Sequence, residues 1–113
     1  MRWFALVLAL LLPLAAMATD GWLDELEIPL MEGLAAAEDG ETVFETSAGR
    51  IVEIETSGAV APDAVRRYYA TALAGLGWQA DAAGGFVRDG ERLQIEITGD
   101  GARTVVAFRL TPQ

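Results

Sequence analysis

The chain has 113 residues, with 17 acidic and 8 basic side chains, a net charge of −9, and no histidine or cysteine. All eight bases are arginines. This length fits one domain at most, and the acidic balance argues against a nucleic-acid or anionic-membrane binder, which needs a basic face. Without cysteine, histidine or lysine there is no disulfide framework, thiolate nucleophile, imidazole proton shuttle or Schiff base. The composition therefore predicts no cofactor.

Residues 1–18 have the pattern of a secretory signal peptide. A basic second residue precedes an apolar run that extends to Ala16, and Ala16-Met17-Ala18 matches an A-x-A cleavage site. A retained membrane anchor is the alternative, but Pro13 interrupts the run and a span needs about 20 apolar residues. We expect the secretion machinery to export the chain to the periplasm or the medium, and the mature chain not to span a membrane.

Charge divides the remainder into two parts. Thr19 to Gly49 contains nine acids and no base, whereas Arg50 to Gln113 contains eight acids and seven arginines. The sequence thus predicts an acidic N-terminal arm at residues 19–41, followed by a single near-neutral domain at residues 42–113.

Apolar side chains are scattered along the acidic arm. Those that could contact a partner are Trp22, Leu26, Ile28, Leu30 and Met31. They can be interpreted as a strap lying across the following domain, as a segment that docks on a partner protein, or as part of a disordered tail.

Regular patterns begin at Thr42. Residues 42–46 are rich in β formers, residues 47–49 favour a turn, and residues 50–57 alternate as a second strand. In that second strand, Val52, Ile54 and Thr56 share one face, and Glu53 and Glu55 share the other.

One helix is expected after this hairpin. Pro62 suits its first turn, and Gly77 suits the left-handed position just past its end. An apolar stripe connects the two ends through Val65, Tyr68 or Tyr69, Ala72, Leu73 and Leu76. Trp78 can then fold back against Leu73.

Strand patterns return after the helix. Residues 78–80 form a short run, residues 86–88 precede an Asp89-Gly90 hairpin turn, and residues 91–98 and 103–111 alternate. The order is β-β-α-β-β-β, so we predict an α+β fold in which one helix packs on an antiparallel sheet.

A search for catalytic groups finds little. Ser47 and Ser57 have no histidine to activate them, so the usual triad is excluded. Glu53 and Glu55 lie two apart on one strand, a spacing typical of a solvated face rather than of a catalytic pair. The Asp-Gly pairs indicate turns, because no D-x-D-x-D-G calcium loop is present. We expect a protein that is not an enzyme.

Four aromatic residues gather near the helix and its exit: Tyr68, Tyr69, Trp78 and Phe86. Core packing explains them most simply. The alternative is an aromatic groove between helix and sheet that accepts an apolar ligand or a peptide.

Three stretches resemble a family of small exported proteobacterial proteins of unassigned function. They are EIPLMEGL at residues 27–34, FETSAGRIVE at residues 44–53, and the pattern Val65-x-x-Tyr68-Tyr69-x-x-x-Leu73-x-x-x-Gly77-Trp78. The last is also similar to a motif of envelope modules of helix-grip type. The resemblance implies an envelope protein with a helix on a sheet, and it implies no catalytic residue.

Two functions follow from these patterns. The first is a non-enzymatic periplasmic or envelope module that binds a protein partner through its acidic arm or an open sheet edge. The second is a carrier of a small apolar ligand or lipid in the groove between helix and sheet.

Overall fold

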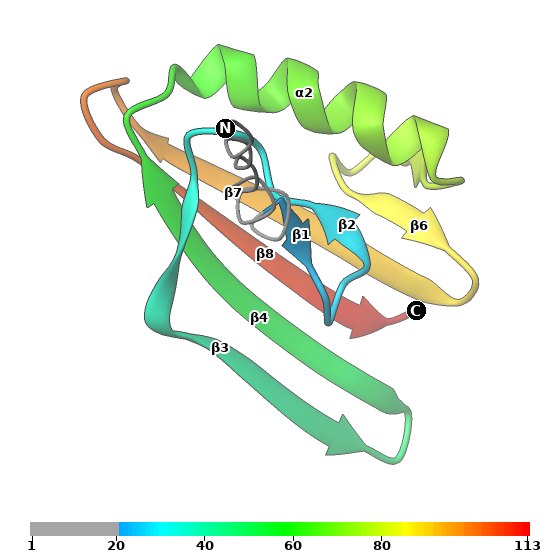
Figure 1. The fold of residues 1–113 in the computed structure, drawn as a ribbon. Helices are drawn as coiled ribbons and strands as arrows, with labels where there is room; N and C mark the ends of the chain where they lie inside the picture. The colour runs from blue at the N-terminus through cyan, green and yellow to red at the C-terminus, as the bar shows by residue number, and fades with distance from the viewer. Residues whose placement is uncertain (1–20) are drawn as a thin grey trace, which may run out of the picture.

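The computed structural model describes residues 21–113, so the expected signal peptide at residues 1–18 lies outside the described residues. It confirms the α+β class, with one helix packed against a mostly antiparallel sheet (Figure 1). The elements are β1 (Trp22–Leu23), β2 (Ile28–Pro29), β3 (Ala35–Thr46), β4 (Gly49–Gly58), α2 (Pro62–Gly75), β5 (Gln79–Ala80), β6 (Phe86–Arg88), β7 (Glu91–Gly99) and β8 (Thr104–Pro112).

The main sheet has six strands in the order β3-β4-β8-β7-β6-β5, and every neighbouring pair is antiparallel. Its two outermost strands differ, because β3 has twelve residues and β5 only two. The order along the chain confirms the expected hairpin, helix and following strands, and adds the small β1–β2 hairpin before them. The two-residue β5 pairs with β6, which makes four strands after the helix.

The alternation expected for the strands is confirmed. Val52, Ile54 and Thr56 on β4 are buried, and so are Thr104, Val106, Phe108 and Leu110 on β8. Glu53 and Glu55 are exposed on the opposite face, where Glu53 forms an ion pair with Arg109 at 3.1 Å. The sheet therefore has one face in the core and one polar outer face.

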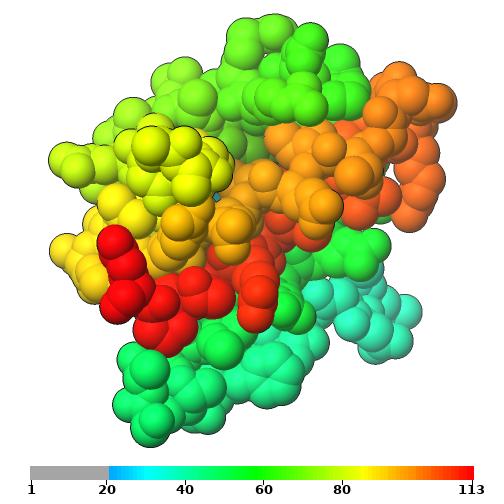
Figure 2. Space-filling view, turned by 180° about the vertical axis from the view of Figure 1, so that it is seen from behind, coloured from blue at the N-terminus to red at the C-terminus, as the bar shows by residue number. Residues whose placement is uncertain are grey.

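Two segments cover the core face together. Helix α2 covers one part, with Val65, Tyr69 and Leu73 buried. The second cover is the N-terminal strap, which we define as residues 21–34 and which includes the β1–β2 hairpin. Leu23, Leu26, Ile28 and Leu34 of the strap belong to the same buried cluster as the helix and the sheet. Figure 2 shows the molecule from behind, where the strap does not cover the outer face.

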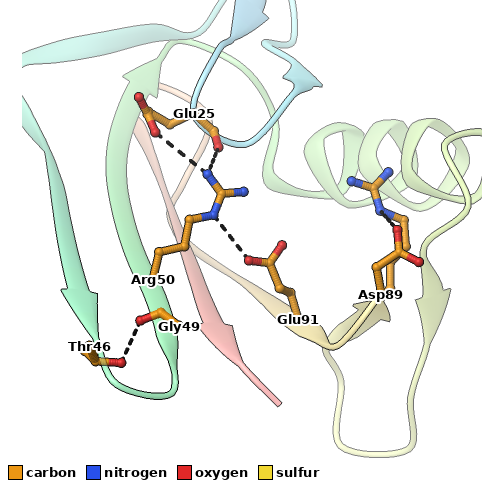
Figure 3. Close-up of polar contacts among 7 residues, drawn as sticks. Glu25, Thr46, Gly49, Arg50, Asp89 and Glu91 are labelled. Atoms are coloured by element: carbon orange, nitrogen blue, oxygen red, sulfur yellow. Dashed lines mark hydrogen bonds and ion pairs between the residues drawn. The ribbon is translucent and has the colours of Figure 1, made fainter.

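Two side chains attach the strap to the rest of the fold. The Tyr69 hydroxyl of α2 donates a hydrogen bond to the Pro29 carbonyl at 2.9 Å and accepts one from the Met31 N–H at 3.0 Å. Arg50 of β4 donates to the Glu25 carbonyl at 3.0 Å and pairs with Glu91 at 3.2 Å (Figure 3). The strap is thus bonded to the helix at one point and to the sheet at another.

The first long strand begins earlier than the sequence indicates. A strand was expected from Thr42, but β3 starts at Ala35 and includes the end of the acidic arm. Its pairing with β4 is irregular between Ala36 and Glu41. The alanine-rich and acidic residues there have no strand pattern of their own, so their extended form follows from pairing with β4 rather than from propensity.

The helix ends as expected. Gly77 has a φ of 92°, and the N–H groups of Gly77 and Trp78 donate to the carbonyls of Ala74 and Leu73, at 3.2 and 3.0 Å. This pair of bonds is the Schellman arrangement, which satisfies free carbonyls at a helix C-terminus. It turns Trp78 into the core, where the side chain is buried.

The strap backbone passes very close to Gly58, at the end of β4. A Cβ added there would overlap the Gly33 carbonyl oxygen. Because backbone occupies that space, we expect Gly58→Ala to displace the strap and to lower the free energy of unfolding by about 1–3 kcal/mol. Urea unfolding measures the effect. Gly75→Ala, where no atom lies within 4 Å of the added Cβ, is the control, and equal effects for the two variants would contradict the close crossing.

Candidate functional site

The four aromatic residues near the helix differ in burial. Tyr69 and Trp78 are buried, and the Tyr69 ring packs edge-on against Phe108 with centroids 5.2 Å apart. Tyr68 and Phe86 are half-buried. Trp78 is additionally covered by Arg88, whose guanidinium lies 4.5 Å from the ring centroid. Core packing therefore accounts for Tyr69 and Trp78.

A cavity of about 410 Å³ lies between α2 and β7. Arg66 and Tyr69 line it from the helix, Ile95 to Ile97 from β7, and Gly84 and Phe86 from the segment before β7. The cavity occupies the place where β6 ends, since β6 pairs with β7 only up to the Phe86–Leu93 pair. Of the four residues proposed for a groove, Tyr69 and Phe86 line this space. Tyr68 and Trp78 are not among its lining residues.

Asp81 holds the loop that borders this cavity. Its carboxylate accepts hydrogen bonds from the N–H groups of Ala83 at 3.0 Å and Gly85 at 2.9 Å, and it pairs with Arg92 at 3.1 Å. The hydrogen bond from Gly85 is the main reason that the pKa of Asp81 lies below its ordinary value, and Arg92 lowers it further.

This pKa gives an acid-side prediction. A depressed folded-state pKa means that the carboxylate stabilises the loop above the ordinary value of 3.8, and that this contribution is lost as pH falls through the depressed value. We expect the amide resonances of Gly84 and Gly85 to titrate with a midpoint below 3.8, and this titration to vanish in Asp81→Asn. A midpoint at or above 3.8 would contradict the hydrogen-bonded loop.

The residues proposed for a partner arm are mostly engaged within the molecule. Leu26 and Ile28 are buried, and Leu30 and Met31 are half-buried against the core cluster. Trp22 is 47% exposed. A partner reaching Leu26 or Ile28 would first have to open the strap.

Strand β3 extends beyond the part of the sheet that the helix and the strap cover (Figure 1). Eleven of its twelve residues are exposed and Gly40 is half-buried, because neither the helix nor the strap extends over it. Val43 and Phe44 are large apolar side chains with 43% and 50% of their surface exposed. Figure 1 shows β3 at the margin of the sheet farthest from α2.

We refer to residues 41–46, the regularly paired part of this strand, as the β3 edge. Pairing with β4 places Glu41, Val43 and Glu45 beside Ile54, Val52 and Arg50, and so on the core side of the sheet. Thr42, Phe44 and Thr46 lie on the outer side. Within residues 21–113, the other margin of β3 has no strand beside it. A partner strand would meet an acid-apolar-acid row on one side and Phe44 on the other.

The acids of β3, like several other acids of residues 21–113, take part in no ion pair. Six ion pairs form among the described residues, and none uses Glu38, Asp39, Glu41 or Glu45. Arg50 lies opposite Glu45 in the register, yet its guanidinium contacts Glu25 of the strap and Glu91 of β7. Glu41 and Glu45 of the β3 edge therefore form no ion pair with another residue of this range.

Val43 and Phe44 are not among the candidate site residues that the sequence patterns indicate. One signal was present, because two adjacent apolar residues in a strand cannot both face the core. One of them had to face away from the core, although the sequence does not show that either would be exposed.

The described residues offer little for other chemistry. No group of three or more acidic side chains in residues 21–113 is close enough together to hold a metal ion. None of the helices within that range has the length and apolar character that a membrane span requires.

Comparisons with protein-family models, with curated proteins and with solved structures found no match to this chain. The resemblance to exported proteobacterial proteins and to helix-grip modules thus stays a prediction. What residues 21–113 define is a small α+β domain with a long exposed edge strand and a cavity beside the helix.

Proposed function

We propose that this protein is a non-enzymatic binding module of the cell envelope, whose partner protein adds a strand to the β3 edge. The observation that carries the proposal is the pair of exposed apolar side chains, Val43 and Phe44, on a strand with one free margin. Free edges present unpaired backbone groups that pair readily with another extended segment. Export to the envelope rests on the signal-peptide pattern of residues 1–18.

The edge is favoured over the strap as the binding surface for a physical reason. A strand joining at β3 uses groups that are already exposed, so the fold need not change. Binding through Leu26 or Ile28 would expose buried apolar surface at a cost of about 25 cal/mol for each Å².

The experiment compares two variants in the organism that makes the protein. Tagged full-length chain is crosslinked in intact cells, and the crosslinked partners are identified by mass spectrometry. We expect the double variant Val43→Ser/Phe44→Ser to lose a partner that the parent chain captures, and Trp22→Ser to keep it.

Trp22 is a matched control because it is an exposed apolar residue, at 47%, on the strap rather than on the edge. Thermal unfolding of each purified variant checks that the fold is kept. Loss of the partner in Trp22→Ser, with retention in the double variant, would place binding on the strap and overturn the proposal.

A second function is favoured by one observation, the cavity of about 410 Å³ beside α2. Its volume lies within the range of small-ligand sites, and Ile95, Ile97 and Phe86 give it apolar walls. A titration with a medium-chain fatty acid should then shift the methyl resonances of Ile95 and Ile97. Unchanged methyl resonances across fatty acids and lysolipids would count against a carrier.

A further inference from the structure

We infer that the segment that pairs with the β3 edge is basic and alternates, with an apolar residue between two arginines or lysines at every second position. This inference rests on the proposed function and specifies the chemistry of the partner. Its basis is the order of side chains along one side of β3: Glu41, Val43, Glu45.

The geometry of paired strands fixes the pattern. Side chains at positions i and i+2 lie on the same side of a strand, roughly 6.5–7 Å apart, and directly opposite residues in a neighbouring strand are in contact. An apolar residue opposite Val43 therefore has its own second neighbours opposite Glu41 and Glu45. Because the row acid-apolar-acid reads the same in both directions, a parallel or an antiparallel partner meets it equally well.

The outer side adds a second apolar contact. Phe44 is half exposed there and lies opposite Ile51 of β4 in the register. If a partner residue between two of the alternating positions is apolar, it would cover the Phe44 ring on the outer side. The recognised partner segment thus has five positions. Positions 1 and 5 are basic and position 3 is apolar, while positions 2 and 4, which face the outer side, are apolar or small.

Charge also decides against a second copy of this chain. Pairing β3 with β3 of another molecule would bring Glu41 and Glu45 of the two copies together, and like charges on facing strands are destabilising. Charged residues on edge strands are a common device against self-pairing. Here the same acids exclude a copy of the chain and admit a strand of opposite charge.

The test uses full-length mature protein labelled with ¹⁵N and three synthetic peptides. The first has the core Arg-Thr-Val-Val-Arg between glycine-serine flanks. The second replaces both arginines with glutamate. The third has the first peptide's composition, with its two arginines adjacent so that the alternation is lost. Amide shifts locate binding, and their concentration dependence gives the dissociation constant.

We expect the first peptide to shift the amides of residues 41–46 and to bind more tightly than the other two. Glu41→Gln/Glu45→Gln should weaken this binding by about 2- to 30-fold, the range for two exposed cross-strand ion pairs. The control is Glu55→Gln/Glu96→Gln, which removes two exposed acids on β4 and β7 that form no ion pair and do not lie opposite the β3 edge, and which should leave the affinity unchanged.

Other outcomes overturn the inference in distinguishable ways. Equal binding of all three peptides at residues 41–46 would reject a basic partner but keep the edge as the docking surface. Shifts at residues 41–46 that grow with protein concentration alone would identify a second copy as the occupant. Peptide-induced shifts confined to residues 94–99, or no shifts at all, would reject the basic partner, whereas the crosslinking experiment decides the proposed function independently.

Discussion

Replacing Ile28 with alanine should lower the free energy of unfolding by about 2–5 kcal/mol. Ile28 lies on the strap, yet its side chain is 0% exposed and belongs to the buried cluster formed by the helix and the sheet. Removing a buried aliphatic side chain loses its transfer free energy and leaves a cavity in the core. The measurement is equilibrium unfolding in urea, followed by circular dichroism.

The matched control is Val43→Ala, an aliphatic truncation on the β3 edge where 43% of the side chain is exposed. We expect it to cost less than about 1 kcal/mol, since much of Val43 stays in contact with water in the folded chain. If Ile28→Ala proved as mild as Val43→Ala, the strap would not be part of the core, and an arm free to bind a partner would become the better interpretation.

Replacing Tyr69 with phenylalanine should lower the free energy of unfolding by about 1–3 kcal/mol. The hydroxyl bonds two backbone groups of the strap, the Pro29 carbonyl and the Met31 N–H, and its loss leaves both without this partner. The ring itself is kept, so its packing on Phe108 is unchanged. Tyr68→Phe is the control, because Tyr68 is half-buried and forms none of the hydrogen bonds that attach the strap. Equal losses in the two variants would contradict this attachment.

The same hydroxyl gives a prediction in alkali. Burial raises the pKa of Tyr69 from 10.0 to about 12, although the Met31 hydrogen bond lowers it in part. A folded-state pKa raised above the unfolded value means that this contribution is complete below pH 10 and is lost as the pH rises toward 12. The alkaline decline in stability should therefore be smaller in Tyr69→Phe than in the parent chain. An identical decline in both proteins would contradict burial of this hydroxyl.

Local patterns predicted the helix, its glycine cap and the strands from β4 onward. They succeeded because Pro62, Gly77 and Asp89-Gly90 determine the backbone conformation of the few residues around them, independently of distant parts of the chain. Asp89 and Gly90 have φ angles of 52° and 82°, both in the left-handed region that a two-residue hairpin turn requires.

Non-local features were harder to predict. Whether the strap packs or is free depends on Tyr69 and Arg50, which lie 40 and 25 residues away from Pro29 and Glu25, respectively. The start of β3 at Ala35 depends on its pairing with β4. No sequence pattern shows which strand will lie at the margin of the sheet, so the exposure of Phe44 could not be predicted.

The docking role of the β3 edge is tested most directly by amide hydrogen exchange. The exchange rates are measured in the complex with its partner, purified from cells without crosslinking, and in the protein alone. We predict that backbone amides of residues 41–46 become protected in the complex, while those of the strap and of residues 94–99 beside the cavity exchange as before. Protection of the strap or of residues 94–99, with residues 41–46 unchanged, would show that the partner binds elsewhere and would contradict the proposed function.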